Sequence, residues 1–564
     1  MLMTKWGEDL NKNCPLSEYP RPQFKRDSYL NLNGIWQCDF CESEEIPSKF
    51  SYDIVVPFSP ETPLSGVNRK LKSNEYLIYN KTFDLPEKFN KGRVFIHFGA
   101  VDQIAKIYLN GNFVGVHHGG YTPFGFEISH LVQEHNTLNV VVRDLTEKNE
   151  YSRGKQKTDR GGIWYSAQSG IWQTVWLEST PDEYIPNVRI TPDLDNQSVT
   201  FEADGDLIVQ KLIYDGDKLI ADTSDTVVKL ENVKEWSPEN PFLYDVVFKY
   251  KDDEVHSYFG MRKFSVGTDN SGMPRLMLNN KPYFMNGLLD QGYYPDGFLT
   301  SPSNEAMEFD VKSVKNLGFN MLRKHIKIEP MLWYHYCDVN GIIVWQDMIN
   351  GGGKYGLEIS VIPFVNITLN DNNYSIFHRT DKEGRDLYYQ ELEEIVDTLY
   401  NCTCIALWVP FNEGWGQFDS NYAYTLVKAM DSTRIVDSAS GWHDRGETDV
   451  ISKHIYFTPI KVHSGRKPWC LTEFGGLSTR VKGHTFNNKM FGYKIFNSKQ
   501  GLTKAYKNLF EKTIIPQIKD GLSATVYTQV TDVEDELNGL FTYDRKVQKI
   551  DTEVLKTINE RVKL

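Results

Sequence analysis

The fold of this chain is constrained most by a repeating pattern in its second half. After Thr268, short apolar runs alternate with stretches whose apolar residues recur at helical spacing. Eight such runs can be counted, at residues 282–290, 319–325, 342–348, 405–409, 434–440, 449–456, 468–473 and 522–529. Strands that alternate with helices form parallel sheets, and eight is the number of strands in a (β/α)8, or TIM, barrel. The sequence therefore predicts a TIM barrel over residues 269–564.

The first half shows short strands and turns without long helical stretches between them. In residues 1–183 the pair Asn110-Gly111 predicts a type I′ hairpin turn. Closely spaced strands of this kind favour a jelly-roll β-sandwich. Residues 184–268 carry several more strands, in a length that suits an immunoglobulin-like β-sandwich. We therefore expect three domains, of which the second serves as a spacer.

Charge and composition argue against several classes of protein. The net charge is -13 and no basic stripe is present, so a nucleic-acid partner is not expected. No uncharged apolar run reaches the length of about 18 residues that spans a membrane. The N-terminus lacks the apolar core of a signal peptide, which predicts a cytoplasmic protein. The seven cysteines include one C-x-x-C, at Cys38 and Cys41, with no second pair, which predicts reduced thiols and no zinc site.

Two of the predicted barrel strands end in a glutamate beside aromatic and glycine residues. Residues 405–418 read I-A-L-W-V-P-F-N-E-G-W-G-Q-F and contain Glu413, and residues 468–476 read P-W-C-L-T-E-F-G-G and contain Glu473. Barrel enzymes keep their chemistry at the carboxyl ends of strands, and glycoside hydrolysis needs two carboxyl groups. Each stretch alone could be a core strand whose glutamate faces water. Because both stretches share one sequence pattern, we favour a pair of glutamates that hydrolyses glycosidic bonds.

Other strand ends carry polar side chains. Arg323 and His325 end the second predicted strand, Asp347 the third and Tyr456 the sixth. An active site at a barrel mouth would gather such residues. Each of them could equally cap a helix or form an ion pair, and the sequence leaves both interpretations open.

Tryptophans lie close to these segments. Trp408 and Trp415 flank Glu413 and are predicted to supply apolar walls, with Trp415 as a surface on which a sugar stacks. Three more tryptophans close the first domain and could form a sugar platform. We favour packing for this set: Trp164, Trp172 and Trp176.

The order of domains and a series of motifs resemble glycoside hydrolase family two, which holds β-galactosidases, β-glucuronidases and β-mannosidases. The resemblance covers nearly the whole chain. Its motifs are weak singly and specific in this order: G-G-I-W-Y-S-A-Q-S-G-I-W-Q-T-V-W-L-E, W-S-P-E-N-P-F-L-Y, F-G-M-R-K-F, F-N-M-L-R-K-H, L-W-V-P-F-N-E and L-T-E-F-G-G. The resemblance implies a retaining exo-β-glycosidase that uses two glutamates in a double displacement.

The resemblance also implies roles for single residues. Glu413 matches the acid/base of the family and Glu473 its nucleophile. Asn412 would bind the sugar 2-hydroxyl, and Tyr456 would lie beside the nucleophile. Two residues, Arg323 and His325, match polar residues at the second strand end. No cofactor is expected to be required, and a structural cation near the carboxylates stays open.

Departures from the family bear on the substrate. The β-galactosidase pattern after the first strand is replaced by G-L-L-D-Q-G at residues 287–292. The motifs V-W-Q-D and T-E-F-G look more like those of β-mannosidases. The Asn-x-Lys clamp of β-glucuronidases is missing. We expect β-galactosidase-like activity first, with β-mannosidase-like or β-glucuronidase-like specificity as the alternative. Four residues are predicted as specificity contacts: Asp290, Gln291, Asp347 and Asp532.

Two other functions use the same scaffold. A non-catalytic carbohydrate-binding protein is disfavoured because both glutamates and Asn412 are present. A transglycosylase would share every catalytic residue, so the sequence does not separate it from a hydrolase. The expected partner is an oligosaccharide or glycoside, and formation of a homo-oligomer stays open.

Overall fold

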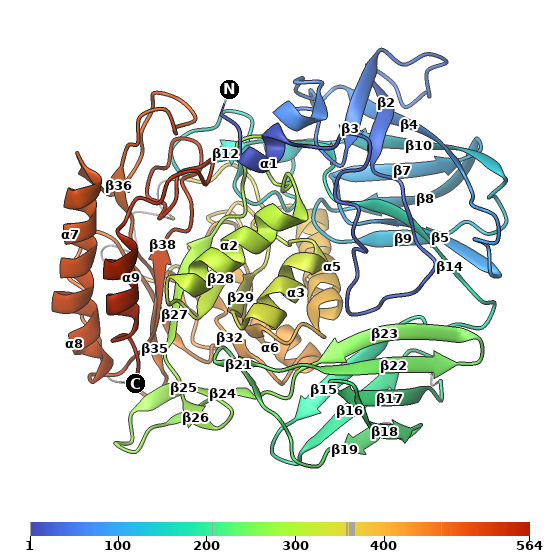
Figure 1. Ribbon diagram of the computed structural model, residues 1–564. Coiled ribbons are helices and arrows are strands. Elements are labelled where there is room, and N and C mark those ends of the chain that lie inside the picture. The colour runs from blue at the N-terminus through green and yellow to red at the C-terminus, as the bar shows by residue number, and fades with distance from the viewer. Residues whose placement is uncertain (1, 206, 357–358, 360–366, 464) are drawn as a thin grey trace.

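The computed structural model describes residues 2–205, 207–356, 359, 367–463 and 465–564. Figure 1 shows a barrel in the centre, with two β-domains packed side by side against it. The first of these, coloured blue to cyan, and the second, coloured green, both contact the barrel on the same side, and the helices α7 to α9 lie on the opposite side. No helix in the described part of the chain is long and apolar enough to cross a membrane.

The first domain is the predicted jelly-roll sandwich. Its apolar residues alternate with polar ones along the strands, so that each sheet turns one face to a shared core. One sheet holds β1 (Leu30–Asn31), β14 (Val175–Thr180), β5 (Arg93–Phe98) and β9 (Phe124–Glu127). The other holds β3 (Tyr52–Val56), β2 (Gly34–Cys41), β4 (Tyr76–Asp84), β10 (His135–Arg143), β7 (Ile104–Leu109) and β8 (Asn112–His118).

The predicted hairpin turn joins β7 to β8. Asn110 and Gly111 have φ angles of 51° and 77°, as a type I′ turn requires at both central positions. This prediction is confirmed.

The second domain is a smaller sandwich with its own core, in the immunoglobulin-like arrangement that was predicted. Three strands form one sheet: β15 (Val188–Asp193), β16 (Ser198–Ala203) and β19 (Val227–Lys229). Four form the other: β18 (Lys218–Thr223), β17 (Gln210–Asp215), β22 (Tyr244–Tyr250) and β23 (Asp253–Phe259). A three-stranded ribbon of β24 (Phe264–Thr268), β25 (Pro274–Leu278) and β26 (Lys281–Pro282) leads from this domain into the barrel.

The barrel contains all eight predicted strands in one parallel sheet. In spatial order they are β32 (Ile435–Val436), β30 (Ile405–Val409), β29 (Ile343–Asp347), β28 (Met321–Lys324), β27 (Met285–Asp290), β38 (Leu522–Thr528), β35 (Trp469–Gly475) and β34 (Ile451–Ile455). Most of their residues are buried on both faces, as expected for strands covered by helices.

The curled sheet is not closed by a strand ladder between its two end strands, β32 and β34. Instead, Asp449 donates its backbone N–H to the carbonyl of Val436 at 2.9 Å. The hydroxyls of Ser440 and Ser452 lie 3.0 Å apart, and Ser452 Oγ also accepts from the backbone N–H of Gly441 at 3.1 Å. Single hydrogen bonds therefore bridge this seam. Next to it, β31 (Phe411–Asn412) pairs with β33 (Ala439–Ser440).

Helices alternate with the barrel strands as predicted, and the sequence analysis did not single out the last one, at residues 552–559. Ser303 caps the first by accepting from Ala306 N–H, and Gly341 ends the second with φ 66°. Within the described residues, the helices of the barrel are α2 (Asn304–Asn316), α3 (Met331–Asn340), α5 (Lys382–Leu399), α6 (Ser420–Met430), α7 (Lys499–Leu509), α8 (Ile515–Ile518) and α9 (Thr552–Asn559). The long loop that the sequence predicts over residues 351–373 lies partly outside the described residues.

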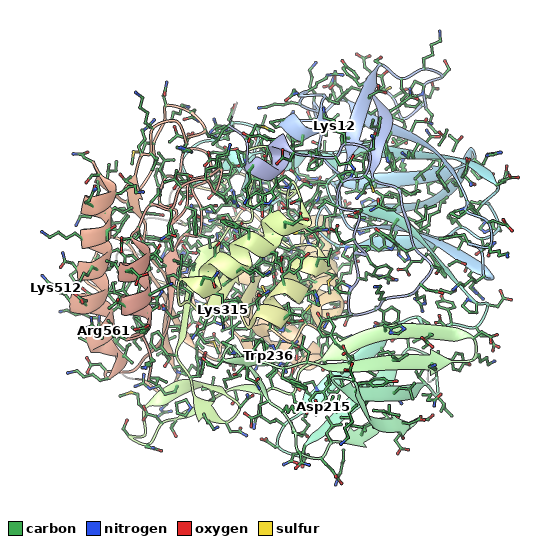
Figure 2. The ribbon with its side chains drawn as sticks, in the orientation of Figure 1. Lys12, Asp215, Trp236, Lys315, Lys512 and Arg561 are labelled. Atoms are coloured by element: carbon green, nitrogen blue, oxygen red, sulfur yellow. The ribbon has the colours of Figure 1, made fainter. Side chains whose placement is uncertain are left out.

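Trp236 joins the second domain to the barrel (Figure 2). The side chain is fully buried and belongs to the barrel's own apolar core. Its Nε1–H donates to the carbonyl of Asp338 in α3 at 2.8 Å, and its backbone N–H donates to Met261. The ring thus fixes the spacer domain to the helix that precedes the third barrel strand.

We expect Trp236→Ala to lower the free energy of unfolding by about 3–5 kcal/mol, because it leaves a cavity between two domains. The loss would appear as a lower urea midpoint. Trp236→Phe should lose less, because most of the ring volume remains. The control is Phe113→Ala, whose side chain is 57% exposed on β8. Equal shifts for Trp236→Ala and the control would contradict this anchoring role.

Candidate active site

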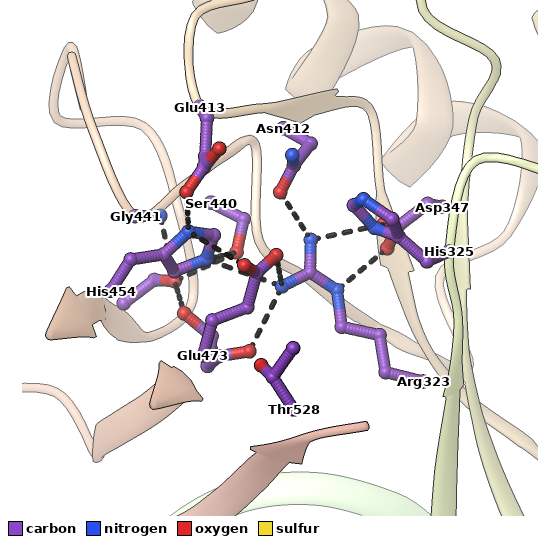
Figure 3. A network of polar contacts seen from close by, with 12 residues as sticks. Arg323, His325, Asp347, Asn412, Glu413, Ser440, Gly441, His454, Glu473 and Thr528 are labelled. Atoms are coloured by element: carbon purple, nitrogen blue, oxygen red, sulfur yellow. Dashed lines mark hydrogen bonds and ion pairs between the residues drawn. The ribbon is translucent and has the colours of Figure 1, made fainter. Parts of the chain in front are cut away.

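The two glutamates meet at the carboxyl ends of the barrel strands (Figure 3). Glu473 lies within β35, and Glu413 directly follows β31. Their side chains, with that of His454, each bring one atom into a set whose members lie within 4.8 Å of one another. Both glutamates are buried, with exposed fractions of 9% for Glu413 and 4% for Glu473. The pairing that the sequence suggested is therefore present in space.

The backbone at Glu413 is held in an uncommon conformation. Glu413 has φ 52°, in the left-handed region that few non-glycine residues occupy. Gly416, in the turn that follows, has φ 66°, and a Cβ there would lie 2.0 Å from the carbonyl oxygen of Gly351. The sequence N-E-G-W-G is thus required to turn the chain sharply and aim Glu413 into the barrel mouth.

Arg323, at the end of β28, joins most of the site. The side chain is fully buried, and its Nε and Nη2 donate to the two carboxylate oxygens of Asp347 at 2.9 and 3.0 Å. Nη2 also donates to Asn412 Oδ1 at 2.8 Å, and Nη1 lies 3.4 Å from Glu473 Oε1. Burial opposes the charge, but Asp347 and Glu473 outweigh it and raise the pKa of Arg323. The guanidinium is therefore a permanent cation beside Glu473.

His325 and Asp347 lie together on the same side of the site. His325 Nδ1 is 2.8 Å from Asp347 Oδ2, so the ring donates from Nδ1 to the carboxylate. Burial lowers the pKa of His325 well below its usual value, and the ring is neutral. Its Nε2 then carries a lone pair that can accept a hydrogen bond from a sugar hydroxyl.

His454 is a site residue that the sequence analysis did not single out. Its side chain is fully buried, and Nδ1 lies 2.7 Å from Glu413 Oε1 and 3.6 Å from Glu473 Oε2. Nε2 is 3.3 Å from Arg323 Nη1, which is always a donor, so Nε2 accepts and Nδ1–H donates to Glu413. Burial lowers the pKa of His454 to about 4, although Glu473 acts to raise it. The ring is a neutral bridge between the two glutamates.

Tyr456 lies two residues beyond His454, beside Glu473. Its hydroxyl donates to Glu473 Oε2 at 2.7 Å, and its ring stacks on that of Tyr493 at a centroid distance of 3.8 Å. Thr528, at the end of the eighth strand, is 2.8 Å from the same hydroxyl. This tyrosine therefore fixes the second oxygen of Glu473.

The two glutamates differ in what surrounds them. Burial raises the pKa of Glu413, and its oxygens accept only from the neutral donors His454 and Trp415, the latter at 3.1 Å. Burial also raises the pKa of Glu473, but Arg323 lies beside this carboxyl, and the proximity of Glu413 opposes a second negative charge. Two buried carboxyls this close favour a state in which one of them keeps its proton.

Aromatic rings cluster around Trp415, whose Nε1–H donates to Glu413 Oε2. The ring of Trp415 lies 5.5 Å from that of Trp164, 5.1 Å from Tyr355 and 6.2 Å from Trp442, measured between centroids. All four are partly exposed. Trp164 comes from the first domain and packs at its interface with the barrel, whereas its companions Trp172 and Trp176 are buried.

Several residues named from the sequence lie elsewhere or are occupied by protein partners. Trp408, predicted as an apolar wall, is fully buried and donates to Asp431 at 2.9 Å, so this prediction is wrong. The carboxylate of Asp290 accepts from Lys324 at 2.6 Å and that of Asp532 from Lys549 at 2.5 Å. Gln291 donates to Gln529 at 2.9 Å. A role for Asp290, Gln291 or Asp532 in substrate binding stays a prediction.

Carboxylate oxygens and imidazole nitrogens can bind metal ions, and such atoms of Glu413, His454 and Glu473 lie close together. The Arg323 guanidinium, 3.4 Å from Glu473, places a fixed positive charge beside this set and opposes a second cation. We therefore keep the expectation that the site works without a cofactor, in preference to one with a bound cation.

A jelly-roll domain, an immunoglobulin-like domain and a TIM barrel with two glutamates at its strand ends define the class of three-domain glycosidase folds. Three family models match the chain in this order. They are the sugar binding domain of glycosyl hydrolases family 2 over residues 22–181, glycosyl hydrolases family 2 over residues 183–262, and the family 2 TIM barrel domain over residues 273–560. The chain belongs to glycosyl hydrolase family 2.

Curated relatives are similar over much of the chain. A β-galactosidase of Thermoanaerobacter pseudethanolicus is 24% identical over 420 residues, covering 69% of this chain and 51% of the relative. A β-galactosidase of Streptococcus thermophilus is 28% identical over 364 residues, covering 59% of this chain and 33% of the relative. This chain thus spans about half or less of the length of these relatives.

Solved structures share the fold over nearly the full length of this chain. A β-glucuronidase of an uncultured Clostridium species superimposes with a TM-score of 0.74 at 18% identity, covering 96% of this chain and 99% of that one. A family 2 β-galacturonidase of Eisenbergiella tayi bound to galacturonate gives a TM-score of 0.70 at 19% identity, with coverage of 96% and 99%.

The neutral state of His454 predicts a loss of stability in acid. Its pKa of about 4 in the folded protein compares with about 6.5 in an unfolded chain. Below pH 6.5 the unfolded chain takes up a proton that the folded protein does not, so stability falls as the pH drops from about 6.5 to about 4, by up to about 3 kcal/mol. His454→Gln removes this term and keeps a donor for Glu413.

Melting temperatures of the wild type and His454→Gln, measured between about pH 7 and pH 4.5, test this expectation. The wild type should lose more than the variant. The comparison of two proteins cancels the contributions of groups that are distant from His454. Glu413 and Glu473 contact His454, and their raised pKa values act in the opposite direction. Parallel pH curves would show that His454 is not held neutral.

Proposed function

We propose that the protein is a retaining exo-β-glycosidase that hydrolyses terminal β-linked sugars. The observation that carries this proposal is the approach of Glu413 and Glu473, whose facing atoms lie within 4.8 Å. Retaining glycosidases hold their two carboxyl groups about 5–5.5 Å apart, whereas inverting enzymes leave space for a water between them. The separation leaves no such space.

Glu473 is proposed as the nucleophile and Glu413 as the acid/base. An oxygen of Glu473 attacks the anomeric carbon while the bond to the leaving oxygen breaks, and that oxygen takes the proton of Glu413. A water then gives its proton to Glu413 and attacks the same carbon, which releases the Glu473 carboxylate. Arg323 and Tyr456, which contact Glu473, favour its ionised form in the resting state.

The residues on the Arg323 side would bind the glycone. Asn412 accepts from Arg323 through Oδ1, which orients its amide N–H groups toward the site and suits a contact with the sugar 2-hydroxyl. His325 offers Nε2 as an acceptor, and Asp347 fixes its ring. These three are proposed as glycone contacts.

The aromatic group beside Glu413 would receive the leaving group. The acid/base protonates the leaving oxygen, so whatever is attached to that oxygen lies near Glu413. Trp415, Trp164, Tyr355 and Trp442 offer flat faces there for a second sugar or an aromatic aglycone.

A galactose-type glycone is the first candidate, because curated relatives are β-galactosidases. A screen of nitrophenyl β-galactoside, β-glucoside, β-mannoside, β-xyloside, β-glucuronide and β-galacturonide, with and without a chelator, tests the proposal. Hydrolysis of one of them with retention of configuration, unaffected by the chelator, would support it. Inversion at the anomeric centre would overturn the mechanism. Added alcohols, through transfer products, separate a transglycosylase from a hydrolase.

Glu473→Ala is expected to lower kcat by at least about 10³-fold, because it removes the nucleophile. Added azide should restore part of the turnover and give a glycosyl azide of inverted configuration. Glu511→Ala, at a partly exposed glutamate that pairs with Arg561, serves as the control and should remain fully active. Full activity of Glu473→Ala without azide would remove Glu473 from this role.

Glu413→Gln is expected to slow substrates with poor leaving groups by at least about 10²-fold and activated aryl glycosides much less, because an aryloxide leaves without a proton. The amide keeps the size of the side chain and its contact with Trp415. The measurement is kcat/KM over a series of aryl glycosides of different leaving-group pKa. A loss that is equal across the series would argue against Glu413 as the acid.

A further inference from the structure

One cation of the first domain is held at the barrel mouth. Lys155 follows Arg153 and Gly154, whose backbone N–H groups donate to the carbonyl of Asn350 at 2.8 and 3.0 Å. Asn350 lies three residues beyond Asp347. A Cβ on Gly154, whose φ is 61°, would lie 3.0 Å from the carbonyl oxygen of Ile326, the residue after His325. The backbone before Lys155 is therefore in contact with the segments that follow two site residues.

The loop that carries Lys155 is built to stay in this place. Arg153 donates from its guanidinium to the carbonyls of Gly352 and Gly353 in the barrel. Tyr121 OH donates to the carbonyl of Arg153 at 2.8 Å, and Tyr165 N–H donates to the carbonyl of Lys155 at 3.0 Å. The short strands β11 (Gln156–Lys157) and β12 (Tyr165–Ser166) then pair in parallel. Lys155 is thus presented by a rigid support.

The ammonium group of Lys155 lacks a hydrogen-bond acceptor in the part of the chain that the structure describes. The side chain is half-buried, and Nζ lies 5.3 Å from the ring centroid of Tyr165. Among the described residues none accepts a hydrogen bond from Nζ, and no carboxylate forms an ion pair with it. Taking a cation partly out of water without a partner is unfavourable, which indicates that a ligand supplies the missing anion.

The charge of Lys155 acts on the candidate site. Burial is the largest influence on the pKa of His325, Asp347, Glu413 and Glu473, and Lys155 lowers the pKa of all four. For His325 it is the largest influence after burial. This agrees with the backbone contacts of Arg153 and Gly154, which place the segment before Lys155 against the residues that follow His325 and Asp347.

We propose that Lys155 makes the glycone pocket selective for a sugar with an anionic substituent, either the carboxylate of a uronic acid or a sulfate ester. The inference rests on the proposed glycosidase function. Lys155 would donate to the anion, while the free Nε2 of His325 would accept from a neighbouring hydroxyl. The recognising cation would come from the first domain and not from the barrel.

Values of kcat/KM for matched substrates test this inference. Nitrophenyl β-galacturonide, β-glucuronide and β-galactoside 6-sulfate are compared with the neutral β-galactoside and β-glucoside. The wild type should prefer at least one anionic substrate over its neutral counterpart. Lys155→Met should lower kcat/KM for that substrate by roughly 10- to 100-fold and change the neutral one by less than about 3-fold. Lys155→Arg should retain part of the preference.

The control is Lys148→Met, at an exposed lysine of the same domain that bonds to Ser73. It should leave both substrate classes unchanged. A wild type that prefers the neutral sugar, or an equal loss on both classes in Lys155→Met, would overturn the inference. The carboxylate and sulfate substrates separate the two anions.

Binding separates this inference from the proposed function. Galacturonate, glucuronate, galactose 6-sulfate and galactose are titrated into Glu473→Gln and into Glu473→Gln with Lys155→Met, by calorimetry. Tighter binding of an anionic sugar that is lost with Lys155 would support the inference even if no glycoside were hydrolysed. Hydrolysis of neutral glycosides with no effect of Lys155 in either assay would leave the proposed function standing and overturn the inference.

Discussion

The buried guanidinium of Arg323 is the constraint from which the geometry of the site follows. A fully buried cation is stable only when carboxylates and other acceptors surround it, and Arg323 has them from three directions. Asp347 accepts from two of its nitrogens, Asn412 from one, and the carbonyl of Thr472 and Glu473 lie against the third. These partners come from the ends of different strands. Satisfying one charge therefore fixes the positions of side chains that are far apart in the sequence.

The same charge gives different surroundings to two glutamates that are chemically alike. Glu473 lies beside Arg323, whereas Glu413 accepts only from neutral groups. His454 lies between them and contacts Arg323 through Nε2, so the guanidinium also sets which ring nitrogen carries the hydrogen. Arg323 thus contacts one of the two glutamates directly and, through Nε2 of His454, the ring that lies between them.

The sequence alone was sufficient for the barrel and for the glutamate pair, because strand-end position is a local property that apolar runs reveal. Residues whose role depends on tertiary partners could not be found in this way. His454 lies inside a strand pattern, and its importance arises only when the sixth strand meets the fourth and seventh. Asp290 and Asp532 look available in the sequence, but each has a buried lysine partner that only the fold brings near. Trp408 belongs to the fully buried strand β30, so its side chain packs in the interior although Glu413 follows closely in the sequence.

Because the first domain contributes residues to the barrel mouth, the site is complete only after this domain has docked onto the barrel. Trp164 and the loop of Arg153 and Gly154 belong to a sandwich with its own core, yet they complete a site whose other parts belong to the barrel. Domains of this size generally fold as units and dock afterwards. A chain with a formed barrel and an undocked sandwich would hold both glutamates and still lack part of its pocket. During refolding, the recovery of sugar binding would then report the docking step. The recovery of helical structure would report the earlier formation of the barrel.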